Sequence, residues 1–376
     1  MAGEKRDVGI GVVGCGTISS AYLRNLTKAA GVRVVALADI DVDRASARAT
    51  EFGVPLATDP DSLLDLPDVD LVIDLTIPAA HYDVNSRALL AGKAVYSEKP
   101  LSVDAGSANA LLNQATGLGL ALGGAPDTFL GAGQQTAAAA LDAGVIGAPF
   151  AAVAHMVSRG PESWHHSPEF LFQPGAGPLY DIGPYYVTAL VNFFGPVKSV
   201  TASATRGFQT RTIGSGPRAG TSFDVGTDTH TTLLLEFVSG VHATLLTSFD
   251  VSASDLPRFE VFGTTGTLAV PDPNTFGGPV RVRRSRDTDW EDIPLGPGWT
   301  ENARGIGALE LALATSQGRP ARASGALAAH VIEVLDGAVR AAADGQRQDI
   351  SSRPQRPARL SQDEHMALGW KPEVAP

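Results

Sequence analysis

The chain has 376 residues, 44% of them hydrophobic and 18% charged, a composition that excludes wholesale disorder. Its length favours two domains over one. The formal net charge of −11 argues against a nucleic-acid partner, because few basic side chains can replace the counterions of phosphates. The single cysteine, Cys15, excludes an internal disulfide and fits a reducing compartment. The first residues lack a signal-peptide core and no apolar run could span a bilayer, so we expect a cytoplasmic protein without membrane contact.

The chain opens on the order strand, turn, helix. An apolar run at 8–13 leads into a Gly-x-Gly turn, which a helical pattern follows. Gly14 permits the sharp turn, and Gly16 leaves room for a pyrophosphate against bare backbone. Thr17 and Ile18 lead into a helix whose first amides face the phosphates. We therefore predict a dinucleotide site at this turn.

The next predicted strand supplies an acid for the same site. The apolar run at 32–38 ends at Asp39, where a carboxylate accepts hydrogen bonds from the ribose hydroxyls of NAD and repels a 2′-phosphate. We therefore expect NAD as the preferred cofactor. Nearby Arg44 could bind a phosphate instead, so NADP stays open.

The first third of the chain alternates short apolar runs with segments of helical spacing. This alternation predicts an α/β domain over residues 1–124, built on a doubly wound parallel sheet with ligands at the carboxyl ends of its strands. The predicted strands are 8–13, 32–38, 71–75 and 93–97, and the predicted helices are 42–51, 81–90 and 105–115.

The pattern changes after residue 124. Period-two runs separated by turn residues predict a large, open, mainly antiparallel sheet, so residues 125–376 are expected to form an α+β domain. One face of this sheet must be covered by helices or by another subunit. The predicted strands are 150–157, 197–205, 229–237, 242–249, 258–262 and 280–284, and the predicted helices are 134–141, 179–194, 304–315 and 325–343.

Two strands of the first domain end in residues suited to line a cofactor cleft. Glu98, Lys99 and Pro100 directly follow the strand at 93–97. A lysine there would point at the nicotinamide and the substrate, although a solvated surface lysine is the plainer alternative. Lys99 is one of only six lysines in this chain. Unlike arginine, lysine can lose its proton when partly buried. We expect Lys99 to be functional.

The strand at 71–75 closes on the same edge. Thr76, Ile77 and Pro78 would line the cofactor side of the cleft. His81 begins the next predicted helix, and there a capping or phosphate-proximal role is as reasonable as a catalytic one. We do not expect it to act as a base.

A Gly/Pro-punctuated stretch at 160–178 delivers the chain into the predicted helix 179–194. At i and i+4, Asp181 and Tyr185 would share one helix face. A carboxylate and a phenol projecting together could hold a polyol and move a proton. A helix-terminal acid and a packed aromatic ring are the simpler alternatives. Tyr186, about 100° away around the helix, should mainly pack.

Three further residues are candidates for substrate binding. Trp164 and His165 precede the predicted helix and would form one wall of the pocket. Asp127 lies at the domain junction, where it could reach the cleft or cap the following helix. No metal site is expected, because no further Cys or His lies at a suitable spacing.

These residues together resemble the Gfo/Idh/MocA oxidoreductases. The resemblance rests on the Gly14–Gly16 turn, the strand-end Asp39, and Glu98-Lys99-Pro100. It also rests on the glycine-rich stretch with Asp181 and Tyr185, where most family members carry His in place of the tyrosine. It implies a Rossmann domain that binds NAD or NADP, with a second domain that binds a sugar, inositol or related polyol. It further implies a homo-oligomer, dimer or tetramer, formed through the second sheet.

The resemblance implies Lys99, Asp181 and Tyr185 as catalytic residues of a reversible hydride transfer at a CH–OH group. Tyr185 would exchange the hydroxyl proton while ammonium Lys99 depresses the pKa of the phenol. Equally, a neutral Lys99 could be the base. Two other functions stay open: an NAD-dependent glycosidase that oxidises its sugar transiently, and a sugar- or NAD-sensing regulator without turnover. Regulators of this fold typically lose the lysine.

Overall fold

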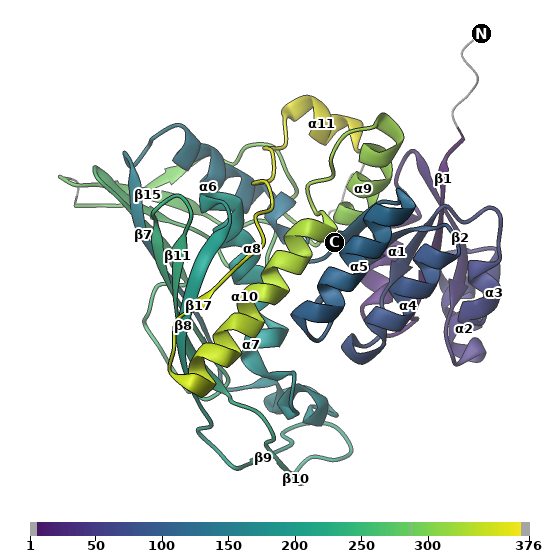
Figure 1. Ribbon diagram of the computed structural model, residues 1–376, viewed down its shortest axis with the longest axis horizontal. Coiled ribbons are helices and arrows are strands. Elements are labelled where there is room, and N and C mark those ends of the chain that lie inside the picture. Colours follow the sequence, from purple (N-terminus) through teal and green to yellow (C-terminus); the bar gives the residue numbers. More distant parts are fainter. Residues whose placement is uncertain (1–5, 287, 370–376) are drawn as a thin grey trace.

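The structure, a computed structural model, describes residues 6–286 and 288–369, and in this part of the chain two large β-sheets lie side by side (Figure 1). The first sheet is parallel, with strand order β3-β2-β1-β4-β5-β6. This confirms the predicted doubly wound sheet and places the reversal of strand order between β1 and β4. Its elements are β1 (Val8–Val13), α1 (Ser19–Leu26), β2 (Val32–Ala38), α2 (Val42–Phe52), β3 (Leu56–Thr58), α3 (Pro60–Leu64), β4 (Leu71–Asp74), α4 (Pro78–Leu90), β5 (Ala94–Ser97), α5 (Ala105–Leu118) and β6 (Leu122–Gly124).

The second sheet has the order β16-β15-β14-β13-β7-β12-β11-β8-β17. All its neighbours are antiparallel except β7 and β12, which pair in parallel. This confirms the predicted large, mainly antiparallel sheet, in which the first strand of the domain, β7, inserts between the later strands β13 and β12. Its strands are β7 (Pro149–Val157), β8 (Val197–Thr205), β11 (His230–Phe237), β12 (His242–Ser248), β13 (Phe259–Gly263), β14 (Gly266–Ala269), β15 (Val280–Arg284), β16 (Glu291–Ile293) and β17 (Gln348–Asp349), and β9 (Thr210–Thr212) with β10 (Ser222–Asp224) forms a separate hairpin.

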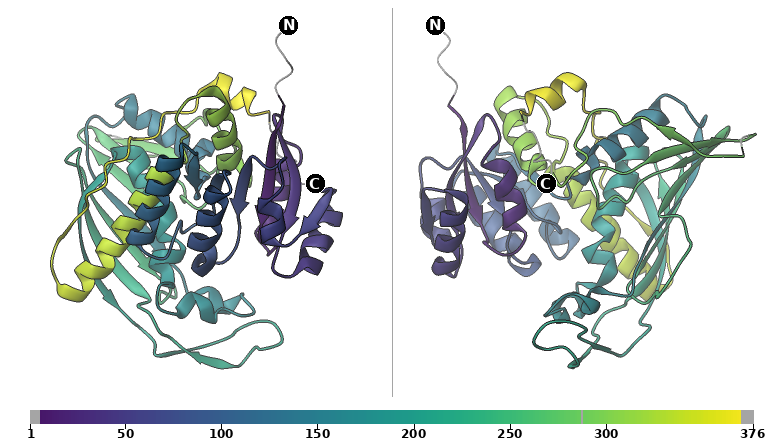
Figure 2. Two further views of the ribbon diagram at one scale, coloured as in Figure 1. Left: turned by 45° about the vertical axis from the view of Figure 1, so that its right-hand side comes forward. Right: turned by 180° about the vertical axis from the view of Figure 1, so that it is seen from behind.

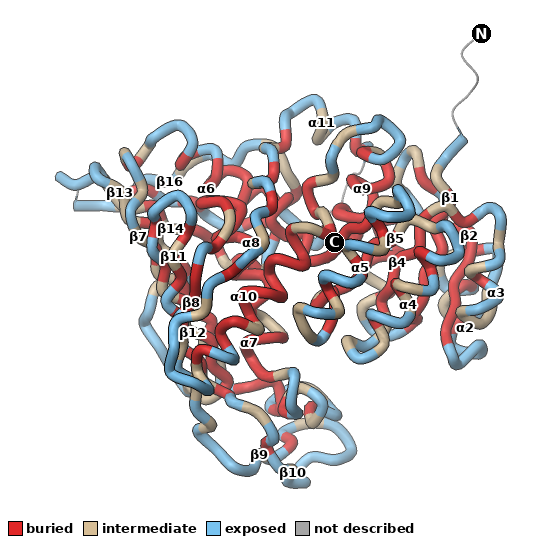
Figure 3. The backbone as a smooth tube through the Cα atoms, viewed as in Figure 1, coloured by how far each residue is buried: buried red, intermediate tan, exposed pale blue. Residues whose placement is uncertain are grey.

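The helices of the second domain pack on one face of its sheet. On the other face, side chains such as Thr232 and Leu234 of β11 are exposed. The buried residues follow the sheet interiors and the helices between the sheets (Figure 3). The helical elements are η1 (Thr128–Leu130), α6 (Ala132–Asp142), η2 (Pro161–Ser163), η3 (Glu169–Phe172), α7 (Gly177–Asp181), α8 (Gly183–Phe194), α9 (Ile306–Gln317), α10 (Gly325–Asp344) and α11 (Gln362–Ala367).

The predicted helix 179–194 is two helices. α7 ends at Asp181, and Ile182 (φ −112°) separates it from α8, which begins at Gly183. Pro184 explains the break, because it has no N–H to donate and in a continuous helix its ring would clash with the carbonyl of Tyr180, four residues earlier. Asp181 therefore lies at the end of a helix and not in the first turn of the helix that carries Tyr185.

Two late helices fill the seam between the sheets (Figures 1 and 2). α10 contacts β8 and α8 of the second domain and also α5 and β6 of the first. α9 contacts α1, β5 and β6. A backbone bridge joins Gly123 to Ser324, directly before α10. The first sheet is thus completed by residues from the end of the chain.

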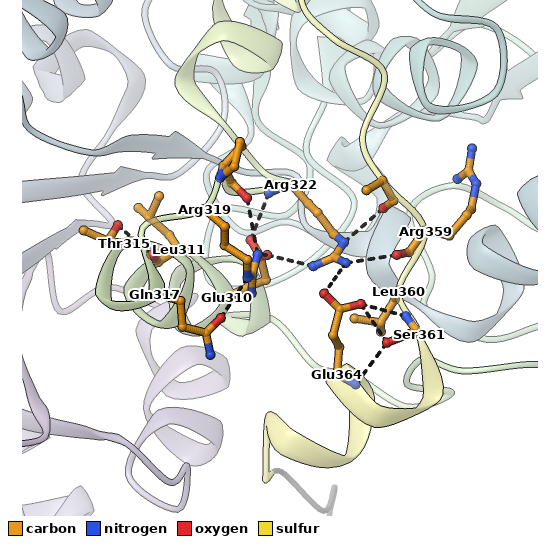
Figure 4. A network of polar contacts seen from close by, with 12 residues as sticks. Glu310, Leu311, Thr315, Gln317, Arg319, Arg322, Arg359, Leu360, Ser361 and Glu364 are labelled. Atoms are coloured by element: carbon orange, nitrogen blue, oxygen red, sulfur yellow. Dashed lines mark hydrogen bonds and ion pairs between the residues drawn. The ribbon is translucent and has the colours of Figure 1, made fainter. Parts of the chain in front are cut away.

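A polar network fastens the C-terminal segment to α9 (Figure 4). Glu310 is fully buried and accepts hydrogen bonds from Arg319 (2.5 Å) and Arg322 (2.9 Å). Arg322 also donates to Glu364 of α11 (2.6 Å). Arg359 extends the attachment to Asn192 of α8 (2.9 Å). The network holds α9 at the seam. Of the helices described, none is both long and apolar enough to cross a membrane.

Candidate active site

The turn after β1 leaves the space that a dinucleotide requires. Gly14 has φ +98°, and a Cβ there would lie 2.6 Å from the Leu75 backbone. At Gly16 a Cβ would meet nothing within 4 Å. Gly16 and Thr17 are exposed, and half-buried Ile18 is the residue before α1. The open position in front of a helix N-terminus suits a pyrophosphate.

Asp39 faces this turn from the end of β2. Its side chain is 6% exposed, and its carboxylate accepts hydrogen bonds from the amides of Cys15 (2.8 Å) and Asp41 (3.0 Å). Arg44 lies 3.6 Å away across an ion pair with Asp39. The backbone bonds fix the carboxylate at the rim of the turn, so the residues present fit the adenosine ribose of a nicotinamide dinucleotide.

The loop after β4 continues the same edge. Ile77 is 67% exposed, and Pro78 is the first residue of α4, three positions before the predicted start at His81. His81 is fully buried, with ring nitrogens 2.6 Å from the Pro100 carbonyl oxygen and 3.1 Å from that of Thr76. His81 therefore joins the Thr76–Pro78 loop to the segment that carries Lys99 and is closed off from solvent.

Glu98 fixes the start of the segment that carries Lys99. One of its carboxylate oxygens accepts a hydrogen bond from the Tyr22 hydroxyl (2.8 Å), and the other accepts one from the Lys99 amide (2.8 Å). The Lys99–Pro100 peptide is cis. Through these contacts α1 and β5 together set the direction in which the Lys99 side chain leaves the sheet.

Lys99 reaches across the seam to α7. Its Nζ lies 2.8 Å from a carboxylate oxygen of Asp181 and 2.7 Å from the Asp181 carbonyl oxygen. The Lys99 side chain is 17% exposed, so it is not the solvated lysine of the plainer alternative. Burial alone would lower the pKa of the ammonium, but Asp181, Tyr185 and Glu98 outweigh burial and hold that pKa above its ordinary value. Lys99 is therefore an ammonium, and a neutral Lys99 base is disfavoured.

Tyr185 joins this cluster through Lys99 and not through a shared helix face with Asp181. The Lys99 Nζ lies 5.5 Å from the centre of the Tyr185 ring. Burial raises the pKa of the Tyr185 phenol, while Lys99 and Arg304 oppose that rise. The expected depression by Lys99 is present but smaller than the effect of burial, so the net direction is upward. At neutral pH Tyr185 is protonated.

Asp127 does not cap the helix that follows it, the second of its two predicted roles. It is 1% exposed, and its Oδ2 accepts hydrogen bonds from the amides of Gly305 (2.9 Å) and Gly307 (3.0 Å). It thus fixes the N-terminus of α9 rather than the helix that follows it. Burial raises the pKa of Asp127 to about 6, although the amides and the Arg304 charge oppose the rise. A direct substrate role for Asp127 stays a prediction.

Trp164 and His165 lie in an exposed aromatic group. Trp164 is 67% exposed, and its ring lies 5.6 Å from that of His165, which in turn lies 5.5 Å from the ring of Phe170. η3, which carries Phe170, contacts α7, at whose end Asp181 lies. Their role as a pocket wall stays a prediction.

Arg304 is a site residue that the sequence reasoning missed. The charge of its guanidinium opposes the rise in the pKa of Tyr185, and the guanidinium donates a hydrogen bond to Asn274 (2.8 Å). It lies in the loop before α9, more than a hundred residues from Tyr185, and carries no motif. Only the folded chain brings the two together. Within the described residues, no group of three or more His, Cys, Asp or Glu side chains is placed to hold a metal ion.

Comparison with known proteins finds a family model for each of two regions of the chain. Residues 8–123 match the family model for the oxidoreductase family with an NAD-binding Rossmann fold, and residues 134–269 match the GFO/IDH/MocA C-terminal domain. An inositol 2-dehydrogenase of Ralstonia nicotianae is 34% identical over 157 residues, which is 40% of this chain and 46% of that protein. The match thus spans about half the length of that relative.

Two further similarities extend over more of the chain. A 1,5-anhydro-D-fructose reductase of Ensifer adhaerens is 28% identical over 76% of this chain and 83% of its own length. A levoglucosan dehydrogenase solved with NADH and L-sorbose has a TM-score of 0.79 at 20% identity, covering 92% of this chain and 99% of that one. With both of its domains matched by models of one family, the chain belongs to the GFO/IDH/MocA oxidoreductases and has an NAD-binding Rossmann domain.

Proposed function

We propose that this protein is a dehydrogenase or reductase that transfers a hydride between NAD and a CH–OH group of a sugar, inositol or related polyol. The observation that carries the proposal is the Lys99 ammonium. It follows β5 at the cofactor edge of the sheet and is held by Asp181 next to the Tyr185 ring. An acid–base pair at this edge lies where ligands of doubly wound sheets bind. Relatives named for inositol and anhydrofructose chemistry support the substrate class.

The chemistry divides between cofactor and protein. The nicotinamide, when bound, accepts or supplies the hydride. Asp181 takes two hydrogens of Lys99 on its carboxylate and carbonyl oxygens, and the third N–H of the ammonium is left to donate to a substrate oxygen. That donation polarises a carbonyl or holds a hydroxyl in place.

Tyr185 exchanges the proton in this proposal. In the direction of carbonyl reduction, the protonated phenol donates to the oxygen that receives the charge. In the direction of alcohol oxidation, the phenolate form accepts the hydroxyl proton. Because the pKa of Tyr185 is raised, the donor form dominates at neutral pH. Lys99 then orients the substrate oxygen, and Tyr185 is the acid or base.

The proposal also includes the preferred cofactor, the division into domains and the cellular compartment. The fixed Asp39 carboxylate supports NAD over NADP, with Arg44 beside it as the residue that could admit a phosphate. The division into a cofactor domain, 1–124, and a substrate domain, 125–376, is supported by the two sheets. A cytoplasmic location is supported by the chain's single cysteine.

A homo-oligomer, dimer or tetramer, is supported by the uncovered face of the second sheet. Leu234 of β11 is 51% exposed, whereas its neighbours Leu233 and Leu235, on the face packed by helices, are buried. Apolar side chains on an open sheet face favour pairing with a second copy. Light scattering of wild type and of Leu234→Glu tests this, and a wild-type monomer would contradict it.

A substrate panel tests the function. Purified protein is mixed with NAD or NADP and with inositols, aldoses and glycosides, and formation of the reduced cofactor is followed by absorbance. We expect turnover with at least one polyol or sugar. Release of an aglycone without net reduced cofactor would instead show a glycosidase. Cofactor binding without any turnover across the panel would show a sensor.

A further inference from the structure

We propose that the substrate contains two sugar rings and that Trp164, His165 and Phe170 form a subsite for the second ring, next to the ring that reacts. We call these three side chains the aromatic platform. They lie on the segment that joins β7 to α7 through η2 and η3. The inference rests on the proposed function, because it narrows the substrate class of the same site.

Exposed aromatic side chains gather in one region of the protein. Among the described residues, four Phe or Trp side chains are more than half exposed: Trp164 (67%), Phe150 (55%), Phe170 (54%) and Phe208 (51%). Phe208 lies shortly before β9, whose partner strand β10 contacts η3. Exposed apolar side chains that gather on one part of a surface are typical of a binding site.

The β9–β10 hairpin holds the segment that carries the platform. The amide of Gly214, after β9, donates to the Glu162 carbonyl oxygen (2.7 Å), and the amide of Gly226, after β10, donates to the Phe172 carbonyl oxygen (2.7 Å). Arg211 of β9 forms an ion pair with the Glu162 carboxylate (2.7 Å). These contacts leave the platform side chains themselves free, so binding requires little further ordering of the backbone.

The rings of the platform do not cover one another. The ring centres of Trp164 and His165 lie 5.6 Å apart with 66° between their planes, and those of His165 and Phe170 lie 5.5 Å apart with 67° between theirs. Rings in this edge-to-face arrangement overlap less than stacked rings. Aromatic surface therefore stays open, and the C–H face of a sugar ring is a group that packs well on it.

His165 adds a hydrogen-bond donor to the platform. Its Nδ1 accepts a hydrogen bond from the Ser167 amide (3.1 Å). A neutral imidazole whose Nδ1 is an acceptor carries its proton on Nε2, which is then a donor. This donor lies on the ring that contacts both Trp164 and Phe170. Apolar surface beside a single donor matches a sugar ring, which has a C–H face rimmed by hydroxyl groups.

The charges of the segment favour an uncharged ligand. Residues 160–176 contain two carboxylates, and each is paired with an arginine of the hairpin: Glu162 with Arg211 (2.7 Å) and Glu169 with Arg218 (2.5 Å). A phosphate or carboxylate ligand would need cations without partners, and these two arginines are committed to the glutamates. A second neutral sugar ring needs no such cation.

The platform adjoins the end of the site at which Lys99 lies. η3 contacts α7, and α7, a helix of five residues, ends at Asp181, whose carboxylate binds the Lys99 Nζ (2.8 Å). Five helical residues rise only about 7.5 Å. In Figure 1 α7 and the hairpin lie low in the view, and β1 begins at the top, so the carboxyl edge of the first sheet faces the same side. A sugar ring held at Lys99 therefore has its neighbouring ring near the platform.

The test compares two-ring with one-ring sugars. Full-length protein saturated with NADH is mixed with maltose, cellobiose, lactose or trehalose, or with glucose or galactose, and binding is followed by saturation-transfer NMR, which needs no turnover. We expect at least one two-ring sugar to bind about tenfold more tightly than its single rings, with saturation of the protons of both rings. Trp164→Ala should remove this advantage, and Trp164→Phe should keep part of it.

Trp290→Ala is the matched control. Trp290 lies directly before β16, where the guanidinium groups of Arg281 and Arg283 are 5.7 Å and 5.0 Å from its ring centre. β16 is the edge strand of the second sheet, and neither it nor β15 carries a residue of the site. The advantage of the two-ring sugar should therefore persist in Trp290→Ala.

Steady-state kinetics give a second readout. With the preferred two-ring sugar, the effect of Trp164→Ala should appear as an increase in KM of about tenfold rather than as a loss of kcat. Equal affinity for two-ring and one-ring sugars across the panel overturns the inference, even if single rings are turned over. Dissociation of an oligomer in Trp164→Ala, seen by light scattering, also overturns it and assigns the platform to a subunit contact. A two-ring advantage that depends on Trp164, in a protein that transfers no hydride, upholds the subsite and overturns the proposed function alone.

Discussion

The cofactor edge and the cluster of Lys99, Asp181 and Tyr185 are held together by different kinds of contact. At the cofactor edge, the turn after β1 and the end of β2 are joined by backbone hydrogen bonds to Asp39 over a short stretch of chain. In the cluster, side chains meet across the seam between the domains: Lys99 and Asp181 are 82 residues apart. The first arrangement is set by local backbone. The second arrangement exists only when both domains are docked. We therefore expect substitutions to impair cofactor binding and turnover independently of each other.

Substitution of Lys99 should separate turnover from cofactor binding most clearly. Lys99→Met should lower kcat by at least ~10², because the hydrogen-bond donor to the substrate oxygen is lost. NADH binding, measured by fluorescence, should persist, because the turn and Asp39 are untouched. Lys93→Met is the control: Lys93 precedes β5, at its other end, and donates to the Leu66 carbonyl oxygen (2.8 Å). Near-normal turnover in Lys99→Met would remove the lysine from the mechanism.

The neighbouring residues Tyr185 and Tyr186 should respond differently to loss of the hydroxyl. Tyr185→Phe keeps the ring and removes the hydroxyl, so kcat should fall by roughly 10². Tyr186→Phe should leave kcat near wild type and cost about 1 kcal/mol of unfolding free energy, because one hydrogen bond to Asp272 is lost. Steady-state kinetics and thermal denaturation of both variants decide the assignment. The reverse pattern would make Tyr186 the acid or base.

Substitution of Asp39 tests the cofactor edge. Asp39→Ala should weaken NAD binding by about tenfold to a hundredfold, because hydrogen bonds from ribose hydroxyls to a carboxylate are lost. At saturating NAD, kcat should be retained. Asp43→Ala, an exposed change in the first turn of α2, is the control. Titration of NAD and NADP by fluorescence gives both affinities, and tighter NADP binding by wild type would contradict the role of Asp39.

The pH profile gives the smallest effect, measured as a slope. Because the pKa of Tyr185 is raised, the phenolate is scarce at neutral pH and increases about tenfold per pH unit below that pKa. The rate of alcohol oxidation should therefore rise with pH through the mildly alkaline range, while carbonyl reduction stays nearly flat. The pKa of Lys99 is raised as well, so its ammonium persists. A slope that survives in Tyr185→Phe would point to another group.

The sequence predicted the cofactor edge well because its signals are local. A Gly-x-Gly turn between a strand and a helix, with an acid at the end of the next strand, is a short-range pattern. The break at Ile182 was missed although Pro184 signals it, because the apolar periodicity runs through the break. β3 and β6 are too short for periodicity to show. Arg304 could not be predicted, because the effect of its charge on the pKa of Tyr185 depends on how the chain folds and not on spacing in the sequence.

The seam also bears on the order in which the chain is made. Residues 1–124 leave the ribosome long before α9 and α10, yet those helices cover β5 and β6. A Cβ on Gly325 would touch the Leu122 side chain at 2.6 Å, and one on Gly307 would touch the Tyr96 hydroxyl at 2.3 Å, which shows how closely the late helices fit. Until α9 and α10 have been synthesised, apolar side chains at the β5 and β6 edge of the nascent sheet stay exposed. The cofactor domain is therefore finished only when the substrate domain has been made, and a fragment ending at Gly124 would lack part of its own core.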